Sequence, residues 1–285
     1  MTNMEVRVAK TAGFCFGVKR AVDIALKEAQ DECGPIYTYG QLIHNDQVTE
    51  KLERQGVAVV HTMEELKAVA KGTVILRAHG APPEIYRIIR ENGLRLIDAT
   101  CPYVKKIHRI VSDYAARGYS IMIAGNADHP EVQGIIGWCG DAPVYVIDSA
   151  AQLKDFSRQE GERILLVSQT TFNTKKFQEL VEVCKENGYT SSVVNTICSA
   201  TQERQEEARQ IAADVDMMIV IGGRHSSNTR KLYEICKDEC ENTYYIETFE
   251  DFVFQQTGQV HTIGITAGAS TPEEIIKEVQ NLCQK

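Results

Sequence analysis

The sequence predicts an α/β protein made of three similar lobes, each a small, mostly parallel sheet flanked by helices. Short apolar runs rich in Val, Ile and Tyr alternate along the 285 residues with amphipathic helical patterns, which is typical of parallel sheets covered by helices. Three cysteines also recur, each between an apolar run and a helical pattern. They are Cys15 in GFCFGVKRAV, Cys101 in DATCPYVKKI and Cys198 in NTICSATQER.

The three cysteine segments share later landmarks, which indicates an internal repeat. Histidines follow the cysteines by 29, 28 and 27 residues, at His44, His129 and His225. Strand-end motifs come further on, in the order RAHGAPPE, SQTT and TAGASTPE. Because a shared period with shared landmarks marks repeated units, we expect three lobes. Their expected ranges are 13–97 with Cys15, 98–194 with Cys101, and 195–285 plus the N-terminal strand region 1–12 with Cys198.

Each expected strand is a short run rich in β-branched and aromatic residues. In chain order the strands are expected within residues 6–10, 36–40, 57–60, 73–79, 94–100, 119–125, 144–147, 163–170, 191–197, 217–223, 243–247 and 261–268. Apolar residues at helical spacing predict helices over 18–30, 103–118, 175–188, 201–215 and 272–283. Gly118 and Gly188 close two of these segments and suit helix C-termini.

Composition and charge exclude several classes of function. The net charge is −8 and no run is rich in Lys or Arg, which argues against nucleic acid as a partner. No apolar stretch reaches the length of a membrane span, and the first ten residues lack the apolar segment of a signal peptide. We therefore expect a cytoplasmic protein without a membrane partner, in which the nine cysteines stay reduced or bind metal.

The repeated cysteines predict a shared metal centre. Each lies in a strand-to-helix turn, where N–H groups and the helix dipole favour a thiolate. Three thiolates suggest either a catalytic zinc or an iron–sulfur cluster, and zinc usually recruits His or carboxylate, so the cluster is favoured. A cubane cluster normally takes four cysteines, so three would leave one iron open for chemistry. The other cysteines are interpreted as packing residues: Cys33, Cys139, Cys184, Cys236, Cys240 and Cys283.

Two segments predict an anion site, because phosphate groups bind well at helix N-termini. One is IGGRHSSNTRKLYEI and the other is GASTPEEIIKEV. Together with three histidines at similar strand ends they describe a small polar pocket. The candidate residues are Ser226, Ser227, Asn228, Ser270, His44, His79 and His129. By contrast, His61, His108 and His261 lie outside any motif and are interpreted as structural.

Glu131 in NADHPEVQG is the best candidate for a general acid. Desolvation and neighbouring negative charge would raise its pKa, as proton delivery requires. The alternative is a glutamate that only offsets a helix dipole. Thr170 and Thr171 in SQTTF could relay the proton or hold a substrate hydroxyl.

Taken together, these motifs resemble those of the 4-hydroxy-3-methylbut-2-enyl diphosphate reductase family, the IspH or LytB proteins. GFCFGV, IHN, RAHG, DATCP, HPE, SQTT, HSSNT and GAS.P occur in family order over almost the whole chain. The resemblance implies a trefoil of three lobes around a [4Fe-4S] cluster whose open iron binds the allylic hydroxyl of the substrate. It also implies roles for single residues: Cys15, Cys101 and Cys198 as cluster ligands; His44, His79, His129, Ser226, Ser227, Asn228 and Ser270 at the diphosphate; Thr171 near the hydroxyl; and Glu131 as the proton source.

The reaction implied by the resemblance is a two-electron reductive dehydroxylation that yields isopentenyl and dimethylallyl diphosphates. It is the last step of the non-mevalonate isoprenoid pathway and needs a ferredoxin-like or flavodoxin-like electron donor. Two alternatives stay open from the residues. One is a cluster-dependent hydro-lyase, which needs no donor. The other is an iron–sulfur redox sensor or electron carrier, which has no use for the anion pocket.

Overall fold

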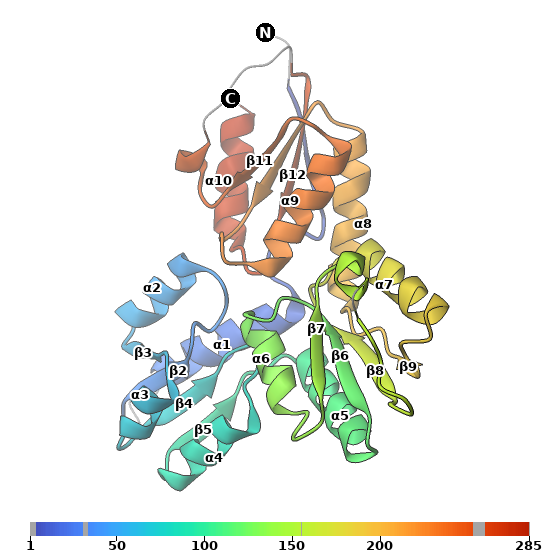
Figure 1. The fold of residues 1–285 in the computed structure, drawn as a ribbon. Helices are drawn as coiled ribbons and strands as arrows, with labels where there is room; N and C mark the ends of the chain where they lie inside the picture. Colours follow the sequence, from blue (N-terminus) through green and yellow to red (C-terminus); the bar gives the residue numbers. More distant parts are fainter. Residues whose placement is uncertain (1–3, 31–33, 155, 253–259, 285) are drawn as a thin grey trace. The chain divides into compact units, whose positions relative to one another are not determined.

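The computed structural model describes residues 4–30, 34–154, 156–252 and 260–284 (Figure 1). Within these ranges the strands form three four-stranded sheets, and every hydrogen-bonded strand pair is parallel. Figure 1 shows each sheet flanked by helices. The predicted α/β class with three small parallel sheets is confirmed.

The twelve predicted strands all occur. They are β1 (Glu5–Val8), β2 (Ile36–Tyr39), β3 (Val57–Val60), β4 (Thr73–Leu76), β5 (Arg95–Asp98), β6 (Ser120–Ala124), β7 (Val144–Ile147), β8 (Ile164–Ser168), β9 (Ser192–Val193), β10 (Met217–Ile221), β11 (Thr243–Ile246) and β12 (Thr262–Ala267). Of these, β3 and β7 have the predicted bounds, β1 begins one residue earlier than predicted and ends earlier, and the others are shorter than predicted.

The α-helices in the described ranges include all five that were predicted. They are α1 (Phe16–Gln30), α2 (Asp46–Arg54), α3 (Met63–Ala68), α4 (Pro83–Glu91), α5 (Pro102–Ala116), α6 (Pro130–Gly137), α7 (Thr174–Glu186), α8 (Ser199–Ala213), α9 (Ser227–Glu239) and α10 (Glu273–Cys283). Gly118 and Gly188 follow α5 and α7 with φ of 75° and 63°, the left-handed conformation that a helix-terminal glycine supplies. The helices α2, α3 and α4 were not predicted, because six to nine residues hold too few turns for a clear apolar period.

The three sheets share one strand topology. From edge to edge the orders are β3-β2-β4-β5, β7-β6-β8-β9 and β11-β10-β12-β1. In each order the chain enters at the second strand, passes to the first edge, returns to the third strand and then reaches the fourth, with β1 taking the fourth place in the last sheet. Each fourth strand leads into one of the three repeated cysteines. The internal repeat is therefore a repeat of topology as well as of sequence.

The described residues fall into two compact units. One contains the sheet β11-β10-β12-β1 and consists of the residues up to Lys19, residues 44–47, and the residues from Ser199 onward. The other contains the two remaining sheets, in residues 20–43 and 48–198. The three lobe ranges predicted from the repeat remain a prediction.

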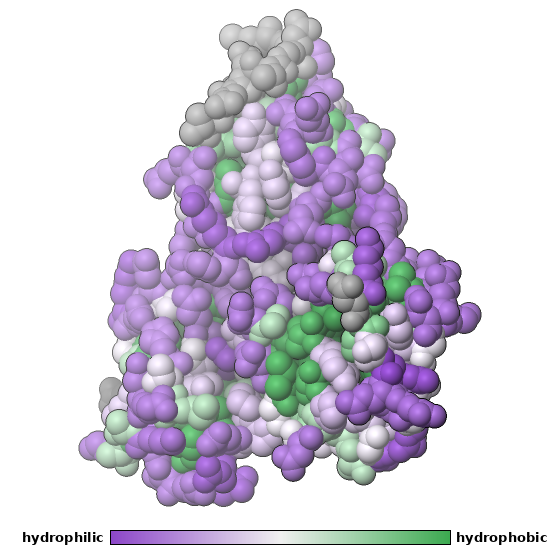
Figure 2. Space-filling model, in the orientation of Figure 1, coloured by the Kyte–Doolittle hydropathy of each residue, from purple (hydrophilic) through white to green (hydrophobic). Residues whose placement is uncertain are grey.

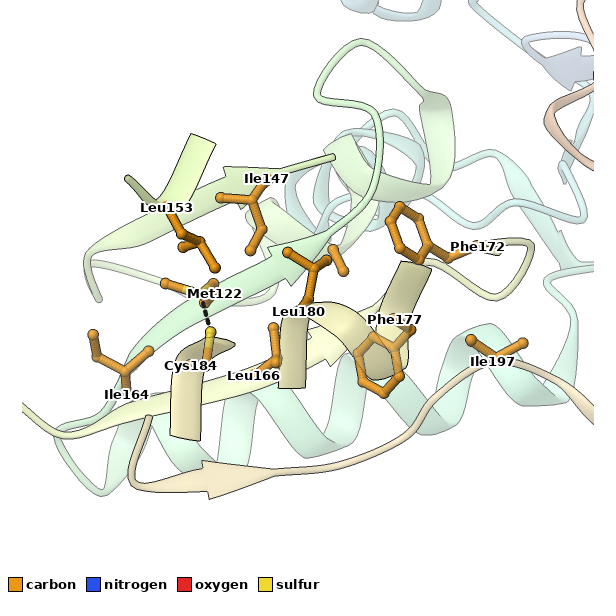
Figure 3. Close-up of a cluster of buried hydrophobic side chains, with 11 residues drawn as sticks. Met122, Ile147, Leu153, Ile164, Leu166, Phe172, Phe177, Leu180, Cys184 and Ile197 are labelled. Carbon is orange, nitrogen blue, oxygen red and sulfur yellow. Dashed lines mark hydrogen bonds between the residues drawn. The ribbon is translucent and has the colours of Figure 1, made fainter. Parts of the chain in front are cut away.

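Alternating side chains of the central strands build separate cores on the two faces of a sheet. In the sheet β7-β6-β8-β9, Met122 and Leu166 belong to the cluster drawn in Figure 3, whereas their neighbours Ile123 and Leu165 belong to a cluster on the other face. Every residue of β6 and β8 is buried. This is the pattern of strands covered by helices on both faces, and it fixes the register that places the strand ends.

The face of the molecule in Figure 2 is mostly hydrophilic. A green area in the region of β6 and β7 is the exception. Across the part of the chain that the structure describes, no helix has both the length and the apolar character to cross a membrane.

Replacing Leu166 with alanine should destabilise the fold. Leu166 is fully buried in the cluster of Figure 3, so the change leaves a cavity and should lower the free energy of unfolding by about 2–5 kcal/mol. Leu96→Ala is the matched control, because Leu96 is 37% exposed on the edge strand β5 and should change it by about 0.5 kcal/mol. Urea unfolding of both variants measures the difference, and equal losses would contradict the burial argument.

Candidate functional site

The three repeated cysteines are held by the same backbone hydrogen bond. In each case the cysteine N–H donates to the carbonyl of the second residue after the third strand of a sheet. The bonds are Cys15 N to Ala269 O (3.3 Å), Cys101 N to Ala78 O (3.0 Å) and Cys198 N to Thr170 O (3.2 Å). Because parallel strands end at one edge of their sheet, this bond places every cysteine at the carboxyl edge, where ligands of α/β proteins bind.

Each repeated cysteine also lies at the start of a helix. Cys101 is the N-cap residue of α5, and Cys15 and Cys198 directly precede α1 and α8. All three are partly exposed, whereas Cys139, Cys184, Cys236, Cys240 and Cys283 are buried. Cys33 lies outside the described residues.

Burial separates the other cysteines from metal chemistry. It raises the pKa of Cys139 and Cys236 to about 12, raises that of Cys184 to about 11, and also raises the pKa of Cys283. A thiol with so high a pKa stays protonated at neutral pH and is a poor metal ligand. The three repeated cysteines, accessible and next to helix N-termini, are the ones whose surroundings suit thiolates.

A second repeated position follows the second strand of two sheets. His129 and Ser226 are the N-cap residues of α6 and α9, and each stands four residues after the glycine that directly follows its strand, Gly125 or Gly222. Their side chains accept backbone hydrogen bonds, His129 Nδ1 from Glu131 N at 3.1 Å and Ser226 Oγ from Thr229 N at 3.3 Å. The sequence repeat matched His129 with His225. The structure instead matches it with Ser226, and His225 is exposed.

His44 is the corresponding residue of the first repeat, four residues after Gly40. It precedes α2 by two residues and is partly exposed. Its backbone carbonyl accepts a hydrogen bond from Ser270 Oγ at 3.0 Å. This bond ties His44 to the loop after β12 within one compact unit.

A third repeated position follows the third strand of each sheet. His79, Thr171 and Ser270 each stand three residues after the end of β4, β8 or β12. Each therefore comes directly after the residue whose carbonyl holds a repeated cysteine. The ring of His79 meets that of His129 edge to face, with centroids 5.4 Å apart. Equivalence within the repeat thus groups Thr171, rather than Thr170, with His79 and Ser270.

Glu131 lies in the first turn of α6, is 2% exposed and contacts Thr170. The Thr170 N–H donates to one carboxyl oxygen at 2.6 Å, and the Thr170 hydroxyl donates to the other at 2.7 Å. Burial raises the pKa of Glu131 to about 7, and the two Thr170 hydrogen bonds oppose that rise. The group therefore changes protonation close to neutral pH, as a general acid does. Because Thr170 also accepts from Cys198 N, one residue connects the carboxyl to a repeated cysteine.

Asn228 is the counterpart of Glu131 in the third sheet. It is buried, two residues after the N-cap Ser226, and its Oδ1 accepts from Ala269 N at 3.1 Å. Ala269 in turn holds Cys15. Ser227, the remaining predicted residue of this segment, is the partly buried first residue of α9.

Two arginines that the sequence reasoning missed support the cysteine segments. Arg20 in α1 donates to the carbonyls of Ala99 and Thr100, just before Cys101, at 3.2 and 3.3 Å. Arg204 in α8 is buried and donates to the carbonyls of Ala267 and Gly13 at 2.8 and 2.9 Å. Arg20 stands five residues after Cys15, and Arg204 stands six residues after Cys198. An arginine at nearly the same distance from two of the repeated cysteines was the signal in the sequence that could have found them.

The fold and these residues define a class of α/β protein in which three equivalent parallel sheets present cysteines, helix N-caps and a buried carboxyl at their strand ends. Residues 6–284 match the family model described as LytB protein. The chain belongs to this family, as its motifs predicted.

Two named relatives are similar over almost the whole chain. A protein from Caldanaerobacter subterraneus subsp. tengcongensis named 4-hydroxy-3-methylbut-2-enyl diphosphate reductase is 45% identical over 278 residues, 97% of this chain and 95% of that protein. A protein of the same name from Aquifex aeolicus is 42% identical over 286 residues, 99% of this chain and 96% of that protein.

Two solved structures share the fold. The structure of the E-1-hydroxy-2-methyl-but-2-enyl-4-diphosphate reductase from Plasmodium falciparum is similar with a TM-score of 0.92 and 28% identity, over 98% of this chain and 88% of that one. A structure titled as (E)-4-hydroxy-3-methyl-but-2-enyl diphosphate reductase, the terminal enzyme of the non-mevalonate pathway, gives a TM-score of 0.69 at 40% identity over 99% of both chains.

Stability should depend on pH through Glu131. Since its pKa lies near 7 when folded and at the ordinary value of 4.5 when unfolded, the folded protein keeps a proton that the unfolded chain releases between these values. The stabilisation from this proton is complete below about pH 4.5 and is lost as the pH rises through about 7. The Glu131→Gln variant cannot titrate at this position, so it lacks this pH-dependent stabilisation. We expect the melting temperature of the native protein to fall relative to that variant between pH 4.5 and 8, whereas parallel curves would contradict the shift.

Proposed function

We propose that this chain reduces (E)-4-hydroxy-3-methylbut-2-enyl diphosphate to isopentenyl and dimethylallyl diphosphates, the last step of the non-mevalonate isoprenoid pathway. It is an oxidoreductase: the substrate takes up two electrons and two protons, loses its allylic hydroxyl and releases one water. The names of the relatives agree with the function predicted from the motifs. The observation that carries the proposal is the threefold set of strand-end residues, in which one backbone hydrogen bond recurs at Cys15, Cys101 and Cys198.

The cysteines Cys15, Cys101 and Cys198 are proposed to hold one [4Fe-4S] cluster with one iron left open. Partial exposure and helix N-termini suit them to this role, and burial with raised pKa values argues against Cys139, Cys184 and Cys236 as ligands. When bound, the cluster would pass on the donor's electrons and supply a Lewis-acidic iron for the oxygen of the allylic hydroxyl. The Cys101 carbonyl accepts from Lys105 N and its N–H donates to Ala78, so the backbone on both sides of this ligand is fixed.

The diphosphate is proposed to bind to His44, His79, His129, Ser226, Ser227, Asn228 and Ser270. These residues offer hydroxyl, amide and imidazole groups, and several of them lie at the N-termini of α6 and α9, where the helix dipole favours an anion. In a chain of net charge −8 such local donors carry the binding, since the overall charge repels the ligand. Binding energy from the diphosphate would position the allylic end for reaction.

Glu131 is proposed to supply protons, first to the departing hydroxyl and then to the allylic carbon chain. A carboxyl with a pKa of about 7 holds a proton at neutral pH and can release it. The Thr170 hydroxyl, which donates to Glu131, keeps the carboxyl oriented. Thr171 is proposed to contact the substrate hydroxyl, because it occupies the repeat position of His79 and Ser270. Protonation at either end of the allylic unit accounts for two products.

The electrons are proposed to come from a ferredoxin-like or flavodoxin-like protein, because the overall reaction consumes two electrons. We place this reaction in the cytoplasm, a compartment that keeps thiols reduced and so suits a thiolate-bound cluster.

Anaerobic turnover with reduced methyl viologen tests the proposed function. Cluster-reconstituted protein should form both five-carbon diphosphates, and Cys101→Ser should abolish turnover and lower the iron content. Cys240→Ser is the matched control: Cys240 is buried, donates to Val215 O at 3.7 Å and is not one of the three repeated cysteines, so both iron and turnover should persist. A four-iron protein without turnover would contradict the proposal.

Glu131→Gln should separate an enzyme from an electron carrier. Removing a general acid typically costs about 10²–10⁴-fold in rate, and the amide keeps the side chain's size, so the iron content should stay at the native level. Turnover and iron per chain are measured on the same sample. If neither the native protein nor Glu131→Gln turns over the substrate, and both transfer electrons to a dye at the same rate, the carrier function would be supported instead.

A further inference from the structure

Helix α6 lies against the loop of residues 78–82 and is joined to it at both ends. At its N-terminal end, the N-cap His129 meets His79 edge to face. At its C-terminal end, the indole Nε1 of Trp138 donates to the carbonyl of Ala81 at 3.0 Å. The helix is eight residues long, and it carries Glu131 in its first turn. The loop and the helix are therefore fixed to each other across the whole length of α6.

Of the two glycines in α6, Gly137 is the one that this close approach requires. A Cβ atom at Gly137 would lie 2.3 Å from Pro82 Cβ and 3.0 Å from Pro82 Cα, which is closer than packed atoms can come. A Cβ atom at Gly134 would lie 3.4 Å from His108 Nε2 and 3.7 Å from Ala81 N, which are tolerable contacts. The contact between α6 and the loop of residues 78–82, called the joint below, is thus tightest beside Trp138.

His108 of α5 fills the space beneath the joint. It is 3% exposed and stacks on Trp138, with ring centroids 5.3 Å apart and planes inclined by 17°. A Cβ atom at Gly80, the residue after His79, would come within 2.7 Å of His108 Cε1. Among the residues that the structure describes, His108 Nε2 has no hydrogen-bond partner. Burial lowers the pKa of His108 to about 4, with opposing effects from Asp98, so the ring is a neutral spacer at physiological pH.

We propose that Trp138 and His108 are positioning residues that set the separation of His79 and His129, and through it the fit of the diphosphate end of the substrate. The inference rests on the proposed function, because these two histidines are proposed diphosphate ligands. Trp138 fixes how far the 78–82 loop stands from α6, and His108 supports both the indole and the backbone beside His79. Neither residue is among the proposed diphosphate ligands, so we expect each to act through the histidine pair.

Trp138→Phe tests the hydrogen bond while keeping an aromatic ring stacked on His108. The buried Ala81 carbonyl loses its donor, and the loop should move relative to α6. We expect the KM for the diphosphate substrate, and the inhibition constant of inorganic pyrophosphate, to rise roughly three- to tenfold. The kcat should change less than twofold, because Glu131 keeps its bonds to Thr170.

Tyr145→Phe is the matched control. It also removes one aromatic hydrogen-bond donor, from Tyr145 Oη to Glu162 Oε1 at 3.0 Å, but on β7 and away from the joint. Its KM should remain at the native value. A second pair compares Gly137→Ala, which should raise KM, with Gly134→Ala, the same change one turn earlier on the same helix, which should raise it much less. This pair decides the question if Trp138→Phe fails to fold.

An NMR measurement keeps the inference testable apart from turnover. In protein with ¹⁵N-labelled histidine, the ring signals of His79 and His129 should shift in Trp138→Phe and not in Tyr145→Phe, with assignment by His79→Asn. A native KM and unshifted ring signals in Trp138→Phe would overturn the inference. Turnover by the native protein would still support the proposed function in that case. Absence of turnover in the native protein would defeat the proposed function, and the ring signals would still decide whether Trp138 positions the histidine pair.

Discussion

Parallel strands all end at the same edge of their sheet, and the chain must satisfy the backbone groups that it leaves there. This molecule satisfies them in the same way three times. The second residue after each third strand turns its carbonyl to the N–H of a cysteine that follows the fourth strand. The position of each cysteine therefore depends on the largely buried third strand of its sheet, which places the carbonyl that holds it. A metal ligand held in this way keeps its place as long as the sheet keeps its register, which the alternating cores on both faces enforce.

The same constraint accounts for the buried carboxyl. The loop residue that accepts from the cysteine also has an N–H of its own, and in two sheets a side chain near the start of a helix accepts from it. Glu131 does so for Thr170, and Asn228 does so for Ala269. An amide in this position is neutral and simply completes the hydrogen bonding. A carboxyl in the same position is desolvated, so its pKa rises to about 7 although two donors face it. A purely structural hydrogen bond and the proposed proton donor thus occupy equivalent positions, and the difference between them is a single functional group.

Sequence reasoning reached the strands and the repeated landmarks, because both leave local signals. Apolar runs of strand length stand between helical patterns, and Cys15, Cys101 and Cys198 recur after them. It assigned His225 as the partner of His129, since counting from the cysteines cannot detect loops that differ by one residue. The structure shows that Ser226 takes that place. The joint of Trp138 with Ala81 and His108 left no signal, because it links residues 57 and 30 positions apart in ways that only packing reveals. For that reason His108 looked like an ordinary core histidine.

The placement of Glu131 and Trp138 on one short helix has a mechanical consequence. An eight-residue helix moves as a rigid rod, about 12 Å long. A shift that moves the C-terminal end of α6 away from Pro82 therefore changes the direction of the whole helix. Glu131, however, is tied to Thr170 by two short hydrogen bonds, so its end is the fixed one and rotation occurs about it. Changes at Trp138 therefore reach the His79–His129 pair more readily than they reach the carboxyl, because His79 belongs to the loop that moves and Glu131 to the end that is held. The fold in this way separates the position of the histidines proposed to bind the diphosphate from the position of the proposed acid, even though both depend on the same helix.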